Sequence, residues 1–193
     1  MTESRLYGAT IAFECSKMKA KILELSKMAL FQVDTIMEIV EKLKDEGFKG
    51  FVTVEELMRN PKLPEDEKGV YVLLYTTGTY PIFLQVGTGG FFKEQDPNVS
   101  IEELETNWID GEQVIYIGKA TSLRNRLSQY MRFGSGKKVG HKGGRFIWQL
   151  KDSANLVVCW KRTEEEPRHV EKKMIAEFKL SHQGRRPFAN LKD

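Results

Sequence analysis

Residues in the C-terminal two thirds of this sequence have the types and spacing that phosphodiester chemistry requires. Hydrolysing a phosphodiester needs an activated water, neutralisation of the developing charge, and assistance to the leaving oxygen. Arg126 and Tyr130 lie four residues apart, so on a helix they would share a face. The guanidinium of Arg126 offers a planar fork of donors to a phosphate. A single carboxylate such as Glu171 can hold one Mg²⁺, which keeps most of its waters and takes a phosphate oxygen as another ligand.

Two tyrosines are candidates for accepting the proton of the attacking water. A free tyrosine has a pKa near about 10, which makes it a poor base at neutral pH. A nearby Lys119 or a bound metal ion would lower that pKa, so either Tyr71 or Tyr116 fits the role. Taken singly, the two tyrosines also fit ordinary half-buried strand positions, and Arg126 fits an exposed helix position.

Glu171 has acidic neighbours that compete for the role of metal ligand. Glu177 is the main alternative, and Glu164, Glu165 and Glu166 are also close in sequence. Carboxylates on a helix are most often solvated surface groups. The residues by themselves therefore leave the choice of ligand open.

The charge of the chain is unevenly distributed. The net charge is +3, but between Lys119 and Lys151 nine Lys or Arg occur with no Asp or Glu. The rest of the chain has 21 basic and 27 acidic residues, a balance of −6. Such a local positive field attracts a phosphate backbone, with steep salt dependence. The candidate nucleic-acid-binding residues are Arg124, Arg132, Lys137, Lys138, His141, Lys142 and Arg145.

The composition is that of an ordinary soluble globular protein. At 193 residues the chain fits one domain or one domain with an appendage, and its 40% hydrophobic residues suffice for a core. The two cysteines, Cys15 and Cys159, exclude a disulfide framework. No apolar run approaches the ~20 residues of a membrane span, and there is no secretory signal core. We expect a cytoplasmic protein that does not engage a membrane.

The pattern of apolar residues predicts an α+β fold. Residues 1–46 follow the helical repeat, as one long helix or two shorter ones, and Thr53 with Glu56 predicts a capping box before a short helix. Later helices are expected near 101–108, after Thr121 or Ser122, at 146–150, and from Pro167 onward. The expected strands are 69–75, 82–86, 114–118 and 156–160. Because the first two strands follow each other directly, antiparallel pairing is expected.

Two tripeptides in this pattern resemble a known signature. Gly69-Val70-Tyr71 and Tyr116-Ile117-Gly118 look like the paired motifs of the GIY-YIG nuclease family. Lys119, Arg126 and Tyr130 fall in register with functional residues of the family, as its bacterial excision-repair members have them. Further on, Glu171 with Met174-Ile175 resembles the metal-binding glutamate of the last helix, and Pro187 with Asn190 resembles the closing Pro-x-x-Asn. The resemblance covers about 69–75 and 114–193.

The resemblance implies a metal-dependent endonuclease, a hydrolase that cleaves phosphodiester bonds in nucleic acid, with DNA as the expected substrate. It implies a small three-stranded antiparallel sheet flanked by helices, and Mg²⁺ or Mn²⁺ on Glu171. Tyr71 would be the base, with Tyr116 as its partner, and Lys119 would lower the pKa of the base. Arg126 and Tyr130 would hold the phosphate. Asn190 would not contact the substrate but would fix the geometry near the metal or the backbone. We expect Tyr71, Tyr116, Arg126 and Glu171 on one face of the sheet.

The sequence departs from the family pattern in ways that define the expected domains. Residues 1–68 are expected to form a helical region of unassigned role, which could mediate dimerisation or bind a protein partner. Residues 69–193 are expected to form the nuclease-like domain. Within it, 76–113 is an insertion that would hold a second hairpin and an acidic helix, and 181–186 is an excess before Asn190. The alternative functions are a non-catalytic nucleic-acid-binding module and an interaction protein built on the same domain.

Overall fold

The N-terminal part of the chain is a single long helix. The computed structural model describes residues 3–60, 64–140 and 143–192, and the chain divides into two compact units, Met1–Glu41 and Lys42–Asp193. Helix α1 (Glu3–Asp45) fills the first unit, so the helical pattern forms one helix and not two. None of the described helices is both long and apolar enough to cross a membrane.

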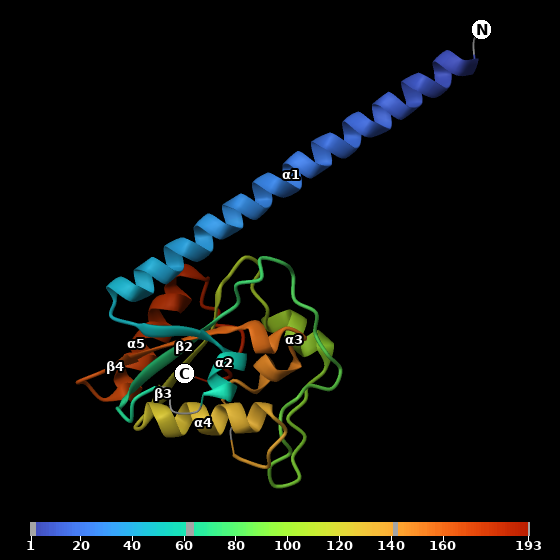
Figure 1. The fold of residues 1–193 in the computed structure, drawn as a ribbon. Helices are drawn as coiled ribbons and strands as arrows, with labels where there is room; N and C mark the ends of the chain where they lie inside the picture. The colour runs from blue at the N-terminus through green and yellow to red at the C-terminus, as the bar shows by residue number, and fades with distance from the viewer. Residues whose placement is uncertain (1–2, 61–63, 141–142, 193) are drawn as a thin grey trace. The chain divides into compact units, whose positions relative to one another are not determined.

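The second unit is built on a four-stranded antiparallel sheet in the order β1-β4-β2-β3 (Figure 1). Its strands are β1 (Lys49–Thr53), β2 (Gly69–Leu74), β3 (Val114–Ala120) and β4 (Val157–Arg162). The prediction of a three-stranded sheet is therefore wrong: the sheet has a fourth strand, β1, which pairs with β4. Its five residues with a bulge after Gly50 carry little local strand signal, so distant pairing decides their structure.

The division of the chain falls before the expected domain boundary near residue 69. Strand β1 and helix α2 (Val54–Arg59) lie in the second unit because β1 completes the sheet. The capping box is formed, since the Thr53 side chain accepts from the Glu56 backbone and the Glu56 carboxylate accepts from the Thr53 backbone. Residues 42–60 are therefore part of the sheet-bearing unit and not of a separate helical region.

Two helices cover the two faces of the sheet. Helix α4 (Leu123–Gly134) lies on one side and α5 (Pro167–Ser181) on the other, and both pack against β2 and β3 (Figure 1). Ser122 caps α4 through the Asn125 backbone amide, and Pro167 occupies the first turn of α5. Strand β2 lies between these layers with every residue buried. Two short 3₁₀ helices, η1 (Arg145–Gln149) and η2 (Ser153–Asn155), precede β4.

The insertion 76–113, which the structure describes throughout, contains no second hairpin. The strand expected at 82–86 is wrong, because only Phe83 forms an isolated bridge, to Leu150. The expected short helix is present as α3 (Ile101–Asn107). Gln149 ties the segment to the core, since its buried side chain bonds the backbone of Leu84 and Val99. The segment is thus a long loop held by the core rather than an extension of the sheet.

Candidate active site

The two tyrosine-bearing strands lie side by side, with Tyr71 paired directly across from Gly118. A Cβ at position 118 would lie 2.4 Å from Cζ and 2.6 Å from the hydroxyl oxygen of Tyr71. The Tyr71 ring therefore lies across the glycine, and any larger residue there would displace it. The glycine of the second tripeptide thus has a packing role that its position opposite Tyr71 explains.

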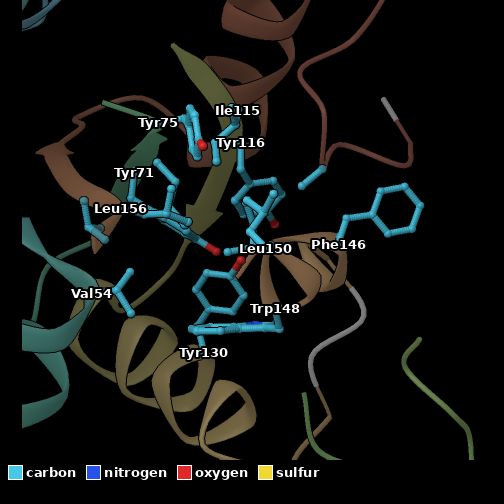
Figure 2. Packing of buried hydrophobic residues seen from close by; sticks show 14 of the residues in the cluster. Val54, Tyr71, Tyr75, Ile115, Tyr116, Tyr130, Phe146, Trp148, Leu150 and Leu156 are labelled. Atoms are coloured by element: carbon cyan, nitrogen blue, oxygen red, sulfur yellow. The ribbon is translucent and has the colours of Figure 1, made fainter. Parts of the chain in front are cut away.

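Three tyrosines converge beneath this pair of strands. The ring of Tyr116 lies 5.9 Å from that of Tyr71 and 6.0 Å from that of Tyr130, between centroids. Figure 2 shows the three hydroxyl groups directed toward one region. Tyr71 and Tyr130 are 0% exposed, and the Tyr130 hydroxyl donates to the Gly144 carbonyl at 2.8 Å. Tyr130 thus holds the loop before η1 in place and does not reach solvent.

Burial changes the acidity of all three hydroxyls. It raises the pKa of Tyr71, and it raises the pKa of Tyr116 and of Tyr130 well above the ordinary value. The charge of Arg126 acts in the opposite direction and lowers the pKa of each. Arg126 is therefore the cation that favours a phenolate in this cluster.

The glycines of the basic loop have a structural role at the same cluster. A Cβ at Gly143 would lie 2.7 Å from the Tyr116 hydroxyl, and one at Gly144 would lie 2.7 Å from the Tyr130 hydroxyl. These glycines let the loop backbone approach the tyrosines closely. His141 and Lys142, expected to bind nucleic acid, lie outside the described residues.

Lys119 and Glu171 lie on the other face of the sheet. Because side chains alternate along a strand, Lys119 points away from the face that Gly118 and Tyr71 share. Its ammonium bonds the Oε2 of Glu171, which belongs to α5 and is 8% exposed. The expectation that Tyr71, Tyr116, Arg126 and Glu171 share one face is therefore wrong.

The two faces meet at the edge of the sheet because β3 is an edge strand. A groove of about 1200 Å³ runs past this edge and collects most of the expected site. Tyr116, Lys119, Arg126, Glu171 and Asn190 all line it, whereas Tyr71 and Tyr130 are not among its lining residues. An edge position is what lets side chains from opposite faces reach one groove.

Asn190 fixes the backbone of β3 next to this groove. Its Oδ1 accepts from the Ile117 amide at 2.9 Å, and its Nδ2 donates to the Ile117 carbonyl at 2.8 Å. The Ala189 amide also donates to the Ile115 carbonyl. Asn190 thus substitutes for a neighbouring strand and positions β3 between Tyr116 and Lys119.

The expected nucleic-acid-binding residues divide into two groups. Arg132 and Arg145 line the groove, and Nε of Arg145 is buried without a hydrogen-bond partner in the described part of the chain. Arg124 instead donates to the Pro64 carbonyl at 3.0 Å. Lys137 and Lys138 are exposed beyond α4 and are not among the residues that line the groove. The basic segment is therefore not one continuous surface.

The groove is also lined by two basic residues that the sequence analysis did not identify, Arg168 and Lys192. Both lie outside the segment 119–151 in which the positive charge concentrates. A signal for Arg168 was present, because it lies three residues before Glu171 and so shares its helix face. Lys192 has no comparable signal.

The carboxylates of the groove can hold a single divalent cation. Glu171 is buried and faces the groove, whereas Glu177, its main competitor, is exposed and does not line it. Lys119 contacts Oε2 and leaves Oε1 of Glu171 without a protein partner among the described residues. Within the part of the chain that the structure describes, no group of three His, Cys, Asp or Glu side chains could enclose a metal. The donor set suits a divalent cation that binds through one or two carboxylates and keeps several waters.

Comparison with known proteins places the similarity over this region. Residues 106–181 match the model of the UvrC-like GIY-YIG domain. The chain is 36% identical over 67 residues to UvrABC system protein C of Cereibacter sphaeroides, which covers 35% of this chain and 10% of that relative. No solved structure matches the chain.

The matched region holds Tyr116, Lys119, Arg126, Tyr130 and Glu171, and leaves out Tyr71 and Asn190. Tyr71 and Asn190 are nevertheless joined to it, through strand pairing with Gly118 and through the bonds to Ile117. Through residues 106–181, the chain resembles the GIY-YIG nuclease family.

Proposed function

We propose that this protein is a metal-dependent endonuclease that hydrolyses phosphodiester bonds in nucleic acid, most readily DNA. The observation that carries the proposal is the groove at the β3 edge, where a phenol, a guanidinium and a lone buried carboxylate meet. Binding alone would not need a buried carboxylate beside a phosphate site, because its negative charge repels the ligand.

Glu171 would hold the metal, Mg²⁺ or Mn²⁺, through its free Oε1. The bound ion would neutralise developing charge on the phosphate and lower the pKa of a coordinated water. Lys119 holds the carboxylate in place from Oε2, and its half-exposed ammonium also faces the groove. Lys119 therefore positions Glu171 and adds positive charge at the phosphate site.

Tyr116 and Tyr71 would accept the water's proton as a pair. Tyr116 lines the groove and is the member that a substrate water can reach. Tyr71 lies behind it, and burial raises its pKa, whereas Arg126 and Tyr116 act in the opposite direction and favour its phenolate. Two phenols in electrostatic contact titrate as one unit, so the proton belongs to the pair.

Arg126 would bind the scissile phosphate and also favour the phenolate. Its Nη1 donates to Gln129 at 3.3 Å, which orients the guanidinium along α4. Preorganised donors of this kind stabilise the charge that develops in the transition state. Tyr130 acts through Gly144 and the loop, and Asn190 acts through the β3 backbone, so both are positioning residues.

Nicking of supercoiled plasmid tests the proposal, with Mg²⁺, with Mn²⁺ and with a chelator. We expect cleavage only with metal, and a loss of at least about a hundredfold in Glu171→Gln. Glu177→Gln is the matched control, because Glu177 lies on the same helix, is exposed and does not line the groove. Equal activity of the two variants would contradict the assignment of Glu171.

The second candidate, a non-catalytic nucleic-acid-binding module, predicts a different result from the same proteins. Wild type would cleave neither plasmid, branched DNA nor RNA with any metal. Glu171→Gln would then bind DNA at least as tightly as wild type, because a repulsive charge is removed.

A further inference from the structure

The groove holds more positive charge than the proposed reaction uses. Its lining has two carboxylates, Glu166 and Glu171, against six basic side chains: Lys119, Arg126, Arg132, Arg145, Arg168 and Lys192. Lys119 is paired with Glu171, and Arg126 serves the tyrosine cluster. The other four basic side chains have no role in the reaction proposed above.

Arg168 is placed by the helix that carries the candidate metal ligand. It precedes Glu171 by three residues on α5, so the two side chains project from one face about 5–6 Å apart at Cβ. Arg168 is exposed and forms no ion pair among the described residues. Its guanidinium is free to bind a ligand beside Glu171.

Lys192 is placed by the anchored C-terminal segment. It follows Asn190 by two residues, and the paired hydrogen bonds from Asn190 to Ile117 fix that segment against β3. Lys192 lines the groove, is exposed, and has no ion pair in the described part of the chain. A segment held this firmly presents its lysine at a defined place.

Arg132 on α4 and Arg145 at the start of η1 also line the groove. From Ser122 to Arg132 the lining follows one face of the helix over about 15 Å, at 1.5 Å per residue. That length matches about four nucleotides of one strand, at roughly 3.4 Å each.

We propose that Arg168 and Lys192, together with Arg132 and Arg145, bind the backbone phosphates that flank the one at Arg126. The ligand is the sugar-phosphate backbone of the strand being cut, gripped through its charge and not through its bases. This inference rests on the proposed function, because it extends the substrate whose scissile phosphate lies at Arg126.

Equilibrium binding of a labelled 30-base-pair DNA duplex in chelator tests the inference without cleavage. We expect the loss of affinity between about 50 and 200 mM salt to be about tenfold smaller in Arg168→Gln/Lys192→Gln than in wild type, as two lost phosphate contacts require. Lys172→Gln/Lys173→Gln is the matched control, because these exposed lysines lie on α5 outside the groove lining. In cleavage assays the first double variant should raise KM and leave kcat near wild type.

The outcomes separate this inference from the nuclease proposal. Reduced salt dependence in Arg168→Gln/Lys192→Gln supports the inference even where wild type cleaves nothing, and in that case only the nuclease proposal fails. Identical salt dependence in wild type and both double variants overturns the inference, even where wild type cleaves. Absence of salt-dependent binding by wild type overturns it as well.

Discussion

The groove at the β3 edge and the insertion 76–113 are built by opposite chemistry. The groove is polar and positively charged, and its side chains are fixed through backbone anchors such as the bonds from Asn190 to Ile117. The insertion packs through aromatic rings, with Trp108 against Tyr75 and Phe83. None of its residues belongs to the groove lining.

The insertion also exposes large apolar side chains, namely Tyr80, Ile82, Val86 and Phe91. Backbone hydrogen bonds join Ile82, Leu84 and Thr88 to the segment around Gln149, and Gly90 to Phe133. After α5, His182 bonds Glu112, and Arg185 donates to the carbonyls of Thr106 and Trp108. The two departures from the family pattern, 76–113 and 181–186, thus contact each other. We therefore expect substitutions in the groove to change the cleavage rate and not the free energy of unfolding. Substitutions that loosen the insertion should change the free energy of unfolding and not the cleavage rate.

The largest expected effect is on the groove side. Arg126→Gln should lower the cleavage rate by about 10²–10³-fold, because it removes a preorganised donor and the cation that lowers the tyrosine pKa values. Its free energy of unfolding should stay within about 1 kcal/mol of wild type. Single-turnover cleavage and urea unfolding measure the two quantities.

Arg59→Gln is the control, since Arg59 pairs with Glu55 on the surface of α2. It should change neither the rate nor the stability measurably. A large loss of stability in Arg126→Gln would break the proposed separation of chemistry from stability.

The next effect is on the insertion side. Gln149→Leu should lower the free energy of unfolding by about 3 kcal/mol, because it leaves three half-buried backbone groups of Leu84 and Val99 unpaired. The rate of cleavage per folded molecule should be unchanged. Gln113→Leu, whose side chain makes one exposed bond to Gly111, should cost less than about 1 kcal/mol. Loss of cleavage in folded Gln149→Leu would show that the insertion serves the groove.

The smallest effect concerns the tyrosine cluster at high pH. Burial raises the pKa of Tyr71, Tyr116 and Tyr130, so the folded protein retains their protons more tightly than the unfolded chain does. Above about pH 10 the unfolded chain releases these protons first, and stability falls by up to about 1.4 kcal/mol per pH unit for each tyrosine. Tyr130→Phe should remove one such contribution from the slope, measured by urea unfolding between pH 9 and 11.

At neutral pH the same variant should lose about 1 kcal/mol, because its hydrogen bond to the Gly144 carbonyl is gone. Parallel alkaline profiles for wild type and Tyr130→Phe would contradict the burial of this hydroxyl.

Local patterns predicted the parts of the fold that local chemistry controls. The apolar runs of β2, β3 and β4, the Thr53–Glu56 capping box, the Ser122 cap and Pro167 at the start of α5 all lie where expected. The paired tripeptides lie on neighbouring strands, since Tyr71 of β2 pairs with Gly118 of β3.

Features that depend on distant partners could not be read from the sequence. Strand β1 forms because it pairs with β4. The segment 82–86 forms no strand, and the Gln149 side chain bonds the Leu84 carbonyl in place of a strand partner. The position of Glu171 on the second face follows from its contact with Lys119, which lies 52 residues away in the sequence. The same holds for Lys192, which reaches the groove only through the anchor at Asn190.

The side chain of Asn190 has a consequence for how this protein behaves at high concentration. An open sheet edge is a template on which another molecule can add a strand, which leads to aggregation. Here the amide and carbonyl of Ile117 are already occupied by Asn190, and the carbonyl of Ile115 by the Ala189 amide. A chain truncated before Pro187 would expose both positions, so the last residues protect solubility as well as shape the groove.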